Sequence, residues 1–321
     1  MAGNATEMQG EVLVFGSLNM DIVCRVERIA RPGETVLGPS YEQLPGGKGA
    51  NQAVAAARAA ASGTTVRMIG AVGTDDFGTA IIANLEANRV DADGIVRSVE
   101  PTGAAFISIA TDGENAITVA SGANRTLDAV ALDGSKISER TVLLLQMETP
   151  LSAIAAAARR MKEAGGRPIL NLAPVPANLT TAALRELAEP LDWLIVNELE
   201  LDAAAKALDV KAGSISDLAR EVGKALALNI IATLGGNGVA AVLQGGDSFV
   251  EPALGVEIED TTGAGDTFCG VFAASIAAGL EARTAVRRAT VAASLACRRV
   301  GAQTAMPSFE ELEAALSKPL P

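Results

Sequence analysis

The chain has 321 residues, 49% of them hydrophobic, which is enough for one large α/β domain or one domain with a smaller appendage. It carries 26 Lys and Arg against 38 Asp and Glu, a net charge of −12, and such an acidic surface repels nucleic acid and anionic lipid. The sequence contains no histidine, so a Ser-His-Asp hydrolase and any other mechanism based on imidazole are excluded.

Short β-branched runs alternate with alanine-rich segments of helical length along most of the chain. Strands are expected at 12–15, 66–71, 142–146, 169–172, 193–196 and 230–234, and helices at 52–61, 77–88, 151–164, 199–208, 216–227 and 267–278. This series predicts a three-layer α/β/α fold with a mainly parallel central sheet. Since no linker or internal repeat interrupts it, a single domain over residues 1–321 is expected.

Two segments break the alternation. Residues 22–44 are rich in proline and glycine and are too long for an ordinary loop between a strand and a helix. Residues 102–119 read as a β-hairpin with a turn at Asp112-Gly113. We expect these lid segments to form a small β-sheet over the carboxyl edge of the main sheet; an edge hairpin without a gating role is the alternative.

The most informative motif is DTTGAGD at 260–266, ahead of an apolar helix. Backbone amides of Gly263, Ala264 and Gly265 would open this helix, where unpaired N–H groups and the helix dipole attract an anion. Asp266 beside them is placed to accept a proton from an alcohol that attacks phosphorus. Taken alone, the motif is equally well a tight turn with Asp266 as a helix cap, and it is not a Walker A loop.

Two further polar clusters are GSLNMD at 16–21, after the first strand, and PGGKGANQ at 45–52, before the first helix. Their amide, carboxylate and amine groups suit a polyol, because each hydroxyl of a polyol both donates and accepts hydrogen bonds. Taken singly, Asn19, Asn51 and Glu148 are as readily turn or cap residues.

The segments GSLNMD, PGGKGANQAVAAAR, QMETP, VNELE, TLGGNG and DTTGAGDTFCG resemble the ribokinase-like (PfkB) sugar kinases in order and approximate spacing, over nearly the whole chain. The first two segments are most similar to the members that act on ribose, and the hairpin TGAAFISIATDGENAITV resembles their lid. The resemblance implies a ribokinase-like fold and transfer of phosphate from ATP to the 5-hydroxyl of D-ribose. Alternatives are a kinase for deoxyribose, fructose or another small sugar, or a non-catalytic regulator that binds a sugar or a nucleotide.

The resemblance also implies roles for individual residues at the matching positions. Asp266 would be the catalytic base, and the anion hole would consist of Gly263, Ala264 and Gly265. Ribose would be bound by Asn19, Asp21, Gly47, Lys48, Asn51, Glu148 and Asp266. ATP would be bound by Asn197, Thr233, Gly235, Gly236, Gly238, Gly265 and Thr290.

Two kinds of cation are implied by the same resemblance. Mg²⁺ would accompany ATP, with Glu200 in its hydration shell. A monovalent cation, usually K⁺, would act as an activator, held by Asp260, Thr262 and the backbone near Ala296, Arg299 and Gly301. Two positions depart from the family pattern: Thr290 replaces a histidine that some members place near the adenine, and Ala305 replaces a serine that can help the cation loop.

Assembly and location are also expected from the sequence. The lid of the family can pair between subunits, which implies a homodimer. Cys24, Cys269 and Cys297 stand far apart and fit reduced thiols at core or boundary positions. The N-terminus lacks a basic region followed by an apolar run, and no uncharged apolar stretch reaches 18 residues. A cytoplasmic protein without membrane or nucleic-acid partners is therefore predicted.

Overall fold

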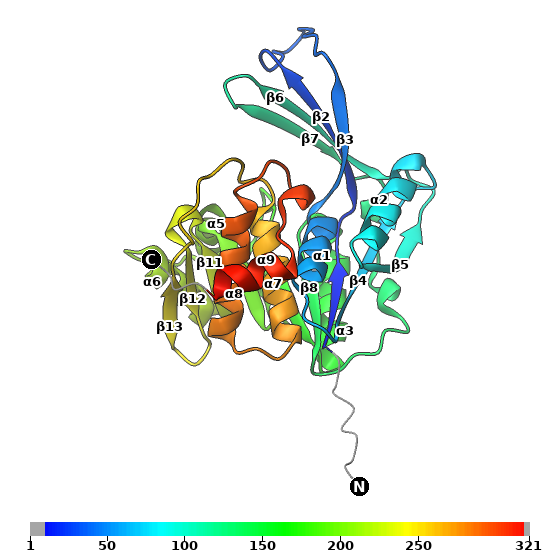
Figure 1. The fold of residues 1–321 in the computed structure, drawn as a ribbon. Coiled ribbons are helices and arrows are strands. Elements are labelled where there is room, and N and C mark those ends of the chain that lie inside the picture. Colours follow the sequence, from blue (N-terminus) through cyan, green and yellow to red (C-terminus); the bar gives the residue numbers. More distant parts are fainter. Residues whose placement is uncertain (1–9, 318–321) are drawn as a thin grey trace.

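A nine-stranded sheet forms the centre of the computed structural model, which describes residues 10–317 (Figure 1). Its strands, in the order β13-β12-β11-β10-β9-β8-β1-β4-β5 across the sheet, are β1 (Gly10–Phe15), β4 (Thr64–Val72), β5 (Asp91–Arg97), β8 (Thr141–Leu145), β9 (Arg167–Asn171), β10 (Trp193–Asn197), β11 (Asn229–Thr233), β12 (Val239–Val242) and β13 (Ser248–Glu251). Only the pairs β11–β12 and β12–β13 are antiparallel among these described strands. The predicted mainly parallel sheet is confirmed. The prediction about the N-terminus concerns mostly residues 1–9, which lie outside the described range.

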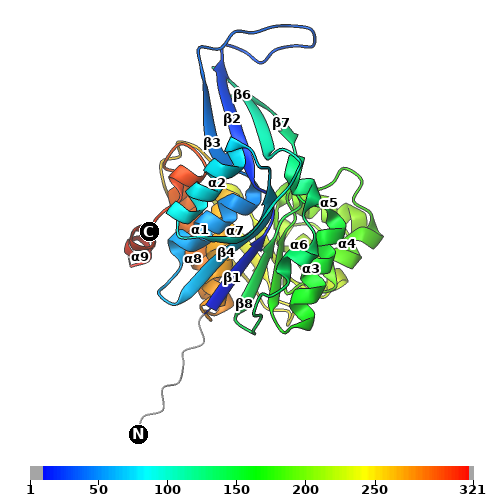
Figure 2. The same ribbon diagram turned by 90° about the vertical axis from the view of Figure 1, so that its right-hand side faces the viewer.

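Helices cover both faces of this sheet (Figure 2). One face carries α1 (Lys48–Ala59), α2 (Asp76–Ala87), α7 (Ala264–Ala277), α8 (Ala282–Ala296) and α9 (Phe309–Leu316). The other carries α3 (Leu151–Glu163), α4 (Thr181–Ala188), α5 (Glu198–Leu208) and α6 (Ile215–Leu226). Along β1, Val12 and Val14 enter one apolar cluster while Leu13 and Phe15 enter the other, so the strand is buried on both faces. The three predicted layers are confirmed.

A second sheet of four strands projects beyond the carboxyl ends of the parallel strands (Figure 1). Its order is β3-β2-β6-β7, formed by β2 (Asn19–Val26), β3 (Tyr41–Gly46), β6 (Gly103–Ala110) and β7 (Asn115–Ala120). The β6–β7 hairpin turns at Asp112-Gly113, as predicted, with Gly113 at φ 90°. Residues 22–44 and 102–119 thus contribute to the predicted small β-sheet, which we call the lid sheet.

Helices α1 and α7 pack almost backbone to backbone. A Cβ added at Gly270 of α7 would lie 2.3 Å from the Gln52 carbonyl oxygen and 2.7 Å from Ala55 Cβ of α1. Below α7, Trp193 of β10 meets Phe272 edge-on, with ring centroids 5.1 Å apart. Because α1 and α7 both begin at the carboxyl edge of the sheet, this packing brings their first turns together.

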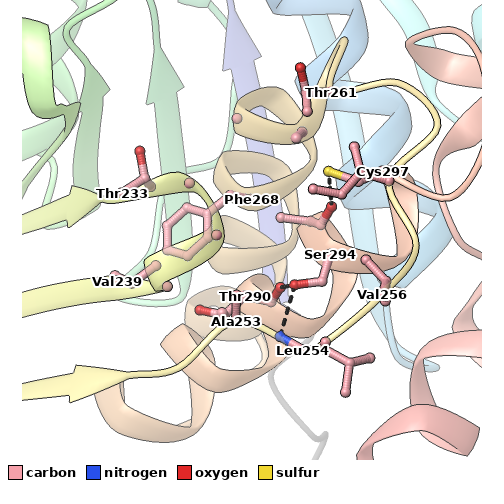
Figure 3. Close-up of a pocket in the computed structure, with 18 residues that line it drawn as sticks. Thr233, Val239, Ala253, Leu254, Val256, Thr261, Phe268, Thr290, Ser294 and Cys297 are labelled. Carbon is pink, nitrogen blue, oxygen red and sulfur yellow. Dashed lines mark hydrogen bonds between the residues drawn. The ribbon is translucent and has the colours of Figure 1, made fainter.

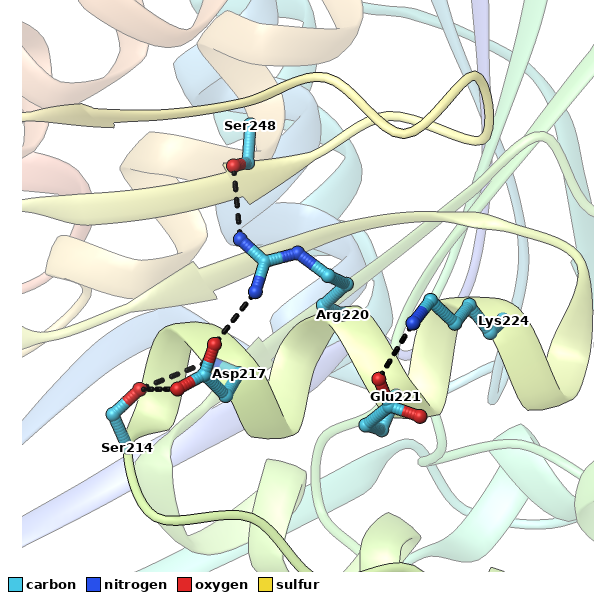
Figure 4. A network of polar contacts seen from close by, with 6 residues as sticks. All are labelled: Ser214, Asp217, Arg220, Glu221, Lys224 and Ser248. Carbon is cyan, nitrogen blue, oxygen red and sulfur yellow. Dashed lines mark hydrogen bonds and ion pairs between the residues drawn. The ribbon is translucent and has the colours of Figure 1, made fainter.

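A surface network connects helix α6 with the antiparallel edge of the sheet (Figure 4). Arg220 donates to Asp217 at 2.6 Å and to Ser248 of β13 at 3.2 Å, and Lys224 pairs with Glu221 at 2.7 Å. Exposed pairs of this kind contribute about 0–1 kcal/mol each. The edge strand therefore depends mainly on its pairing with β12.

Two other sequence-based expectations concern single residues and membrane spans. Cys269 is buried, Cys24 and Cys297 are half-buried, and all three are unpaired, in agreement with the predicted core or boundary positions. Among the helices of residues 10–317, none combines the length and the apolar character that crossing a membrane requires. Short 3-10 helices complete the fold at Gly122–Thr126, Ala129–Leu132, Gly235–Asn237 and Gln303–Ala305.

Candidate active site

Asp266 lies in the first turn of α7, facing α1, and only 8% of it is exposed. Its Oδ2 accepts a hydrogen bond from Asn51 Nδ2 and its Oδ1 one from Gln52 Nε2, each at 3.0 Å. Gly263 is the residue that caps α7, and within residues 10–317 no side chain accepts a capping hydrogen bond from the first amides of this helix. Asp266 therefore does not cap its own helix; it is a buried carboxylate oriented by two amides.

The glycine loop before α7 gives this carboxylate an open, electropositive neighbour. Gly263 adopts a left-handed conformation with φ 74°, which a side chain would strain. A Cβ at Gly265 would meet no atom within 4 Å, so the helix N-terminus faces open space there. The Ala264 N–H, expected in the anion hole, donates instead to Thr261 O at 3.2 Å. The remaining amides and the helix dipole still favour an anion beside Asp266.

A cavity of about 500 Å³ adjoins the lid sheet, and Asn19 and Glu148 are among its lining residues. Glu148 Oε2 accepts hydrogen bonds from the Lys48 N–H at 3.2 Å and from the Ser17 hydroxyl. Asn19 Oδ1 accepts one from Asn124 Nδ2 at 2.8 Å. These contacts do not involve the NH₂ group of Asn19 or the second oxygen of Glu148, a donor and an acceptor of the kinds that suit a polyol.

Carboxylates crowd the same end of the site. Burial raises the pKa of Asp21, on β2, to about 7, and the charges of Glu148 and Asp266 add to this rise. The Asp266 carboxylate raises the pKa of Lys48 despite the burial of that amine. Lys48 therefore stays charged and offsets part of the negative charge. Gly46 gives Asp21 room, since a Cβ there would lie 2.2 Å from Asp21 Oδ2.

A smaller cavity of about 140 Å³ lies between Lys48, Asp266 and the glycine loop, and Asn197, Glu200 and Thr233 also line it. Asn197 caps α5: its Oδ1 accepts the Glu200 N–H at 2.9 Å, and Glu200 Oε2 accepts the Asn197 N–H at 2.8 Å. Burial raises the pKa of Glu200. The capping box thus holds the expected phosphate and magnesium residues at the cavity wall.

The third cavity, of about 310 Å³, continues from the glycine loop toward α8 and is mostly apolar (Figure 3). Thr233, Gly235, Gly236, Gly238, Gly265 and Thr290 line it, as expected for the nucleotide pocket. The Thr290 hydroxyl donates to Val286 O at 2.8 Å, within its own helix. Ser294 donates to Thr290 O at 2.9 Å and accepts the Leu254 N–H at 3.1 Å. These hydroxyls are therefore engaged by backbone.

The predicted cation loop brings residues 260–262 against residues 297–305. Asp260 Oδ1 accepts hydrogen bonds from the Thr262 N–H at 2.9 Å and its hydroxyl at 2.6 Å, and Oδ2 accepts the Gly301 N–H at 2.8 Å. Burial opposes ionisation, but these donors lower the pKa of Asp260. Arg299 pairs through its side chain with Glu311, and Ala305 is fully buried. Asp260 therefore fixes the loop as an anion.

Sequence reasoning missed the buried amides that support the site. They are Asn124 beside Asn19, and Gln52, Gln146, Asn171 and Gln303 around Asp266 and Asn51. Gln52 could have been found, because it follows Asn51 in the PGGKGANQ motif and lies one position further round the same helix turn. Gln303 could not, since about 250 residues separate it from its partner Asn51 and no motif surrounds it.

Fold and site together define a carbohydrate kinase. A buried carboxylate lies at a helix N-terminus, a cavity lined by Asn19 and Glu148 adjoins the lid sheet, and a mostly apolar cavity continues from the glycine loop toward α8. Residues 9–308 match the model of the pfkB family carbohydrate kinases, so the chain belongs to that family.

Individual relatives cover almost the whole chain. The ribokinase of Lactococcus lactis is 36% identical over 96% of this chain and 97% of its own. The solved ribokinase of Thermotoga maritima is 34% identical, with a TM-score of 0.87 over 97% of this chain and 100% of that one. Arabidopsis thaliana ribokinase, solved with ribose and ATP, is 29% identical, with a TM-score of 0.82 over 97% and 100% of the two chains.

Proposed function

We propose that this protein phosphorylates D-ribose at the 5-hydroxyl with ATP. The observation that carries this proposal is the position of Asp266, which lines the cavity at the glycine loop together with Lys48, while the Lys48 N–H donates to Glu148 in the wall of the cavity near Asn19. A sugar hydroxyl from the cavity near Asn19 and a phosphate in the cavity at the glycine loop would meet at this carboxylate. The similarity to ribokinases, one of them solved with ribose and ATP, supports ribose as the sugar.

The reaction is a direct in-line transfer. The 5-oxygen of ribose bonds to the γ-phosphorus as the bond from that phosphorus to the β–γ bridging oxygen breaks, and ADP leaves. Asp266 accepts the hydroxyl proton, and Asn51 and Gln52 keep its two oxygens in place. Lys48 and the N-terminus of α7 stabilise the charge that develops on the phosphoryl oxygens.

Two cations complete the proposal. Mg²⁺ bound with ATP would neutralise the phosphates, and Glu200 and Asn197 offer a carboxylate and an amide at its hydration shell. A monovalent cation, with K⁺ as the usual occupant in the family, would lie beside Asp260 and Thr262. Because Asp260 already accepts three hydrogen bonds, carbonyls near Ala296, Arg299 and Gly301 would supply most of the ligands. Such a cation would fix the loop at residues 297–305 against Gly263. The two are in close contact, because a Cβ added at Gly263 would lie 3.0 Å from Ala302 Cα.

The remaining proposals concern the whole chain. We propose one kinase domain over residues 1–321 whose lid sheet closes over the sugar, and a homodimer that pairs through this sheet. The net charge of −12 supports a protein that avoids nucleic acid and anionic membranes, working in the cytoplasm.

The proposal is tested by ADP release with ATP and Mg²⁺, with and without K⁺, over a panel of ribose, deoxyribose, fructose and no sugar. Ribose should give the highest kcat/KM. A higher kcat/KM with deoxyribose or fructose would overturn the choice of sugar but keep the kinase. Ribose binding without turnover of any sugar would favour the non-catalytic regulator.

Asp266→Asn tests the base in the same assay. The amide cannot take the hydroxyl proton, so kcat should fall by about 10²- to 10⁴-fold while ribose affinity changes little. Asp217→Asn, the same change on the surface of α6, is the matched control and should leave kcat unaltered. Near-normal turnover by Asp266→Asn would show that another group takes the proton.

A further inference from the structure

A chain of side-chain amides runs from helix α2 to Asp266. Asn84 Nδ2 donates to Gln303 Oε1 at 2.7 Å, and Gln303 Nε2 donates to Asn51 Oδ1 at 3.0 Å. Asn51 Nδ2 then donates to Asp266 Oδ2 at 3.0 Å. Every donor in this amide chain points toward the carboxylate, so each amide fixes which end of the next one faces Asp266.

The direction of these bonds matters because the two ends of an amide have the same shape and opposite polarity. If the Asn51 amide turned over, its oxygen would face the Asp266 carboxylate and repel it. Water cannot easily correct the pairing, since Asn51 and Gln303 are each only 7% exposed. The donor that disfavours the turned-over state is the Nε2 group of Gln303.

The second amide on Asp266 is oriented in the same manner. Gln146 Nε2 donates to Gln52 Oε1 at 2.7 Å, which leaves Gln52 Nε2 to donate to Asp266 Oδ1 and to Asn171 Oδ1. Each of the two amides that donate to the carboxylate is therefore oriented by a further amide: Asn51 by Gln303 and Gln52 by Gln146. This repeated arrangement supports a role for the outer amides in orienting the inner ones.

We propose that Gln303 is a positioning residue for phosphoryl transfer: it holds the Asn51 amide with its NH₂ group toward Asp266. The inference rests on the proposed kinase activity and concerns the same site. Gln303 is itself held in place, because Arg58 donates to its carbonyl oxygen at 2.7 Å and to Met306 O at 3.0 Å. The loop that carries Gln303 is thus fastened to helix α1, which carries Asn51.

The test compares two substitutions of nearly equal volume. Gln303→Met removes the donor without adding charge, and Gln303→Glu replaces the donor with an acceptor that favours the turned-over Asn51. We expect kcat to fall about threefold or more in Gln303→Met and about tenfold or more in Gln303→Glu. The KM for ATP should stay within about twofold of the parent value, because the nucleotide pocket lies beyond the glycine loop.

Gln244→Glu is the matched control for charge. It makes the same substitution on an exposed side chain between β12 and β13, where the amide donates to Ala227 O at 2.8 Å. Its kcat should match the parent. If Gln244→Glu lost as much kcat as Gln303→Glu, the added charge would explain the loss and the positioning role would be overturned.

A second measurement needs no turnover. Hydrogen exchange of the Asn51 side-chain NH₂ group, followed by NMR without substrates, should be slow in the parent and about tenfold faster or more in Gln303→Met. This measurement tests the role of Gln303 even if the protein does not phosphorylate ribose. The proposed function is tested separately, by ADP release from the parent enzyme with ribose. Hydrogen exchange also decides the matter if Gln303→Glu fails to fold. Unchanged exchange in Gln303→Met, together with unchanged kcat, would overturn the proposal.

Discussion

Asp21 is a carboxyl group whose ionised form is disfavoured by its burial in the folded protein. Burial raises its pKa to about 7 from a usual 3.8, with smaller contributions from Glu148 and Asp266. A folded state with the higher pKa binds the proton more tightly than the unfolded chain does. The stability that this proton contributes is complete below pH 3.8 and is lost as the pH rises through about 7.

Asp21→Asn should therefore stabilise the protein in alkaline solution. The difference in the free energy of unfolding, variant minus parent, should increase by on the order of 2 kcal/mol from pH 5 to pH 8. Urea unfolding of both proteins at the two pH values, without sugar, measures this gap. A gap that does not change with pH would mean that Asp21 titrates alike in the folded and unfolded states.

Individual site residues were predictable only where they belong to a local motif. Asp266, Asn51 and Lys48 lie within short glycine-containing segments, where a turn and a helix start can be recognised from neighbouring residues. Asn124 and Gln303 reach the site from distant loops, and their amides carry no local signature. Their importance depends on tertiary packing, which a single sequence does not specify.

At the scale of elements, the close packing of α1 and α7 makes the site. Gly270 follows Asp266 by about one turn of α7 and lies opposite the carbonyl oxygen of Gln52. Any side chain at 270 must push the two helices apart. The same displacement would separate Asp266 from Asn51 and Gln52, so packing and chemistry depend on one glycine.

Gly270→Ala should reduce stability and activity together. The added methyl group would lie 2.3 Å from Gln52 O, and overpacking of this kind costs about 1–3 kcal/mol. Thermal unfolding and kcat measure the two effects, and kcat should fall by about tenfold or more at a temperature where the variant stays folded.

Val222→Ala in α6 is the control for this substitution. It removes methyl groups from the apolar cluster on the opposite face of the sheet, so it should cost about 1–3 kcal/mol without changing kcat. Equal loss of kcat in the two variants would mean that general destabilisation, and not the spacing of α1 and α7, controls turnover.

Most strands and helices of the main layers could be predicted because hydrophobic period and length agree there. The main-layer elements that were missed are strands β5, β12 and β13 and helices α4, α8 and α9. Strand β12, for example, is a four-residue VAAV segment, too short and too rich in alanine to stand out. The start of β2 was also missed, since residues 19–21 read as part of a loop motif, whereas the rest of this strand falls within the predicted lid segment 22–44. It is a strand because β3 and β6 pair with it on either side, at distances along the chain that local patterns do not reveal.

For the whole molecule, the lid sheet presents one apolar face on the side of the site. Asp21, Ala105 and Val119 are directly opposite one another across neighbouring strands and so share a face. Ile117 lies on that face two residues from Val119, and the two are 56% and 47% exposed. A second copy of the lid sheet would cover these side chains, which supports the proposed homodimer.

Ile117→Lys should shift the protein toward monomer, because a charge would be buried at the proposed interface. Sedimentation velocity over a range of concentrations measures the shift. Phe106→Lys is the matched control: it adds the same charge to an equally exposed strand residue on the opposite face of the sheet. Equal behaviour of the two variants would argue against pairing through the Ile117 face.

The contact between Trp193 and Phe272 has an optical consequence. The chain contains one tryptophan, and it lies under the helix that begins with the Asp266 turn. Its fluorescence therefore comes from a single buried place next to α7. A change in emission when sugar or nucleotide is added would report movement of that helix directly, without a label and before any phosphate has been transferred.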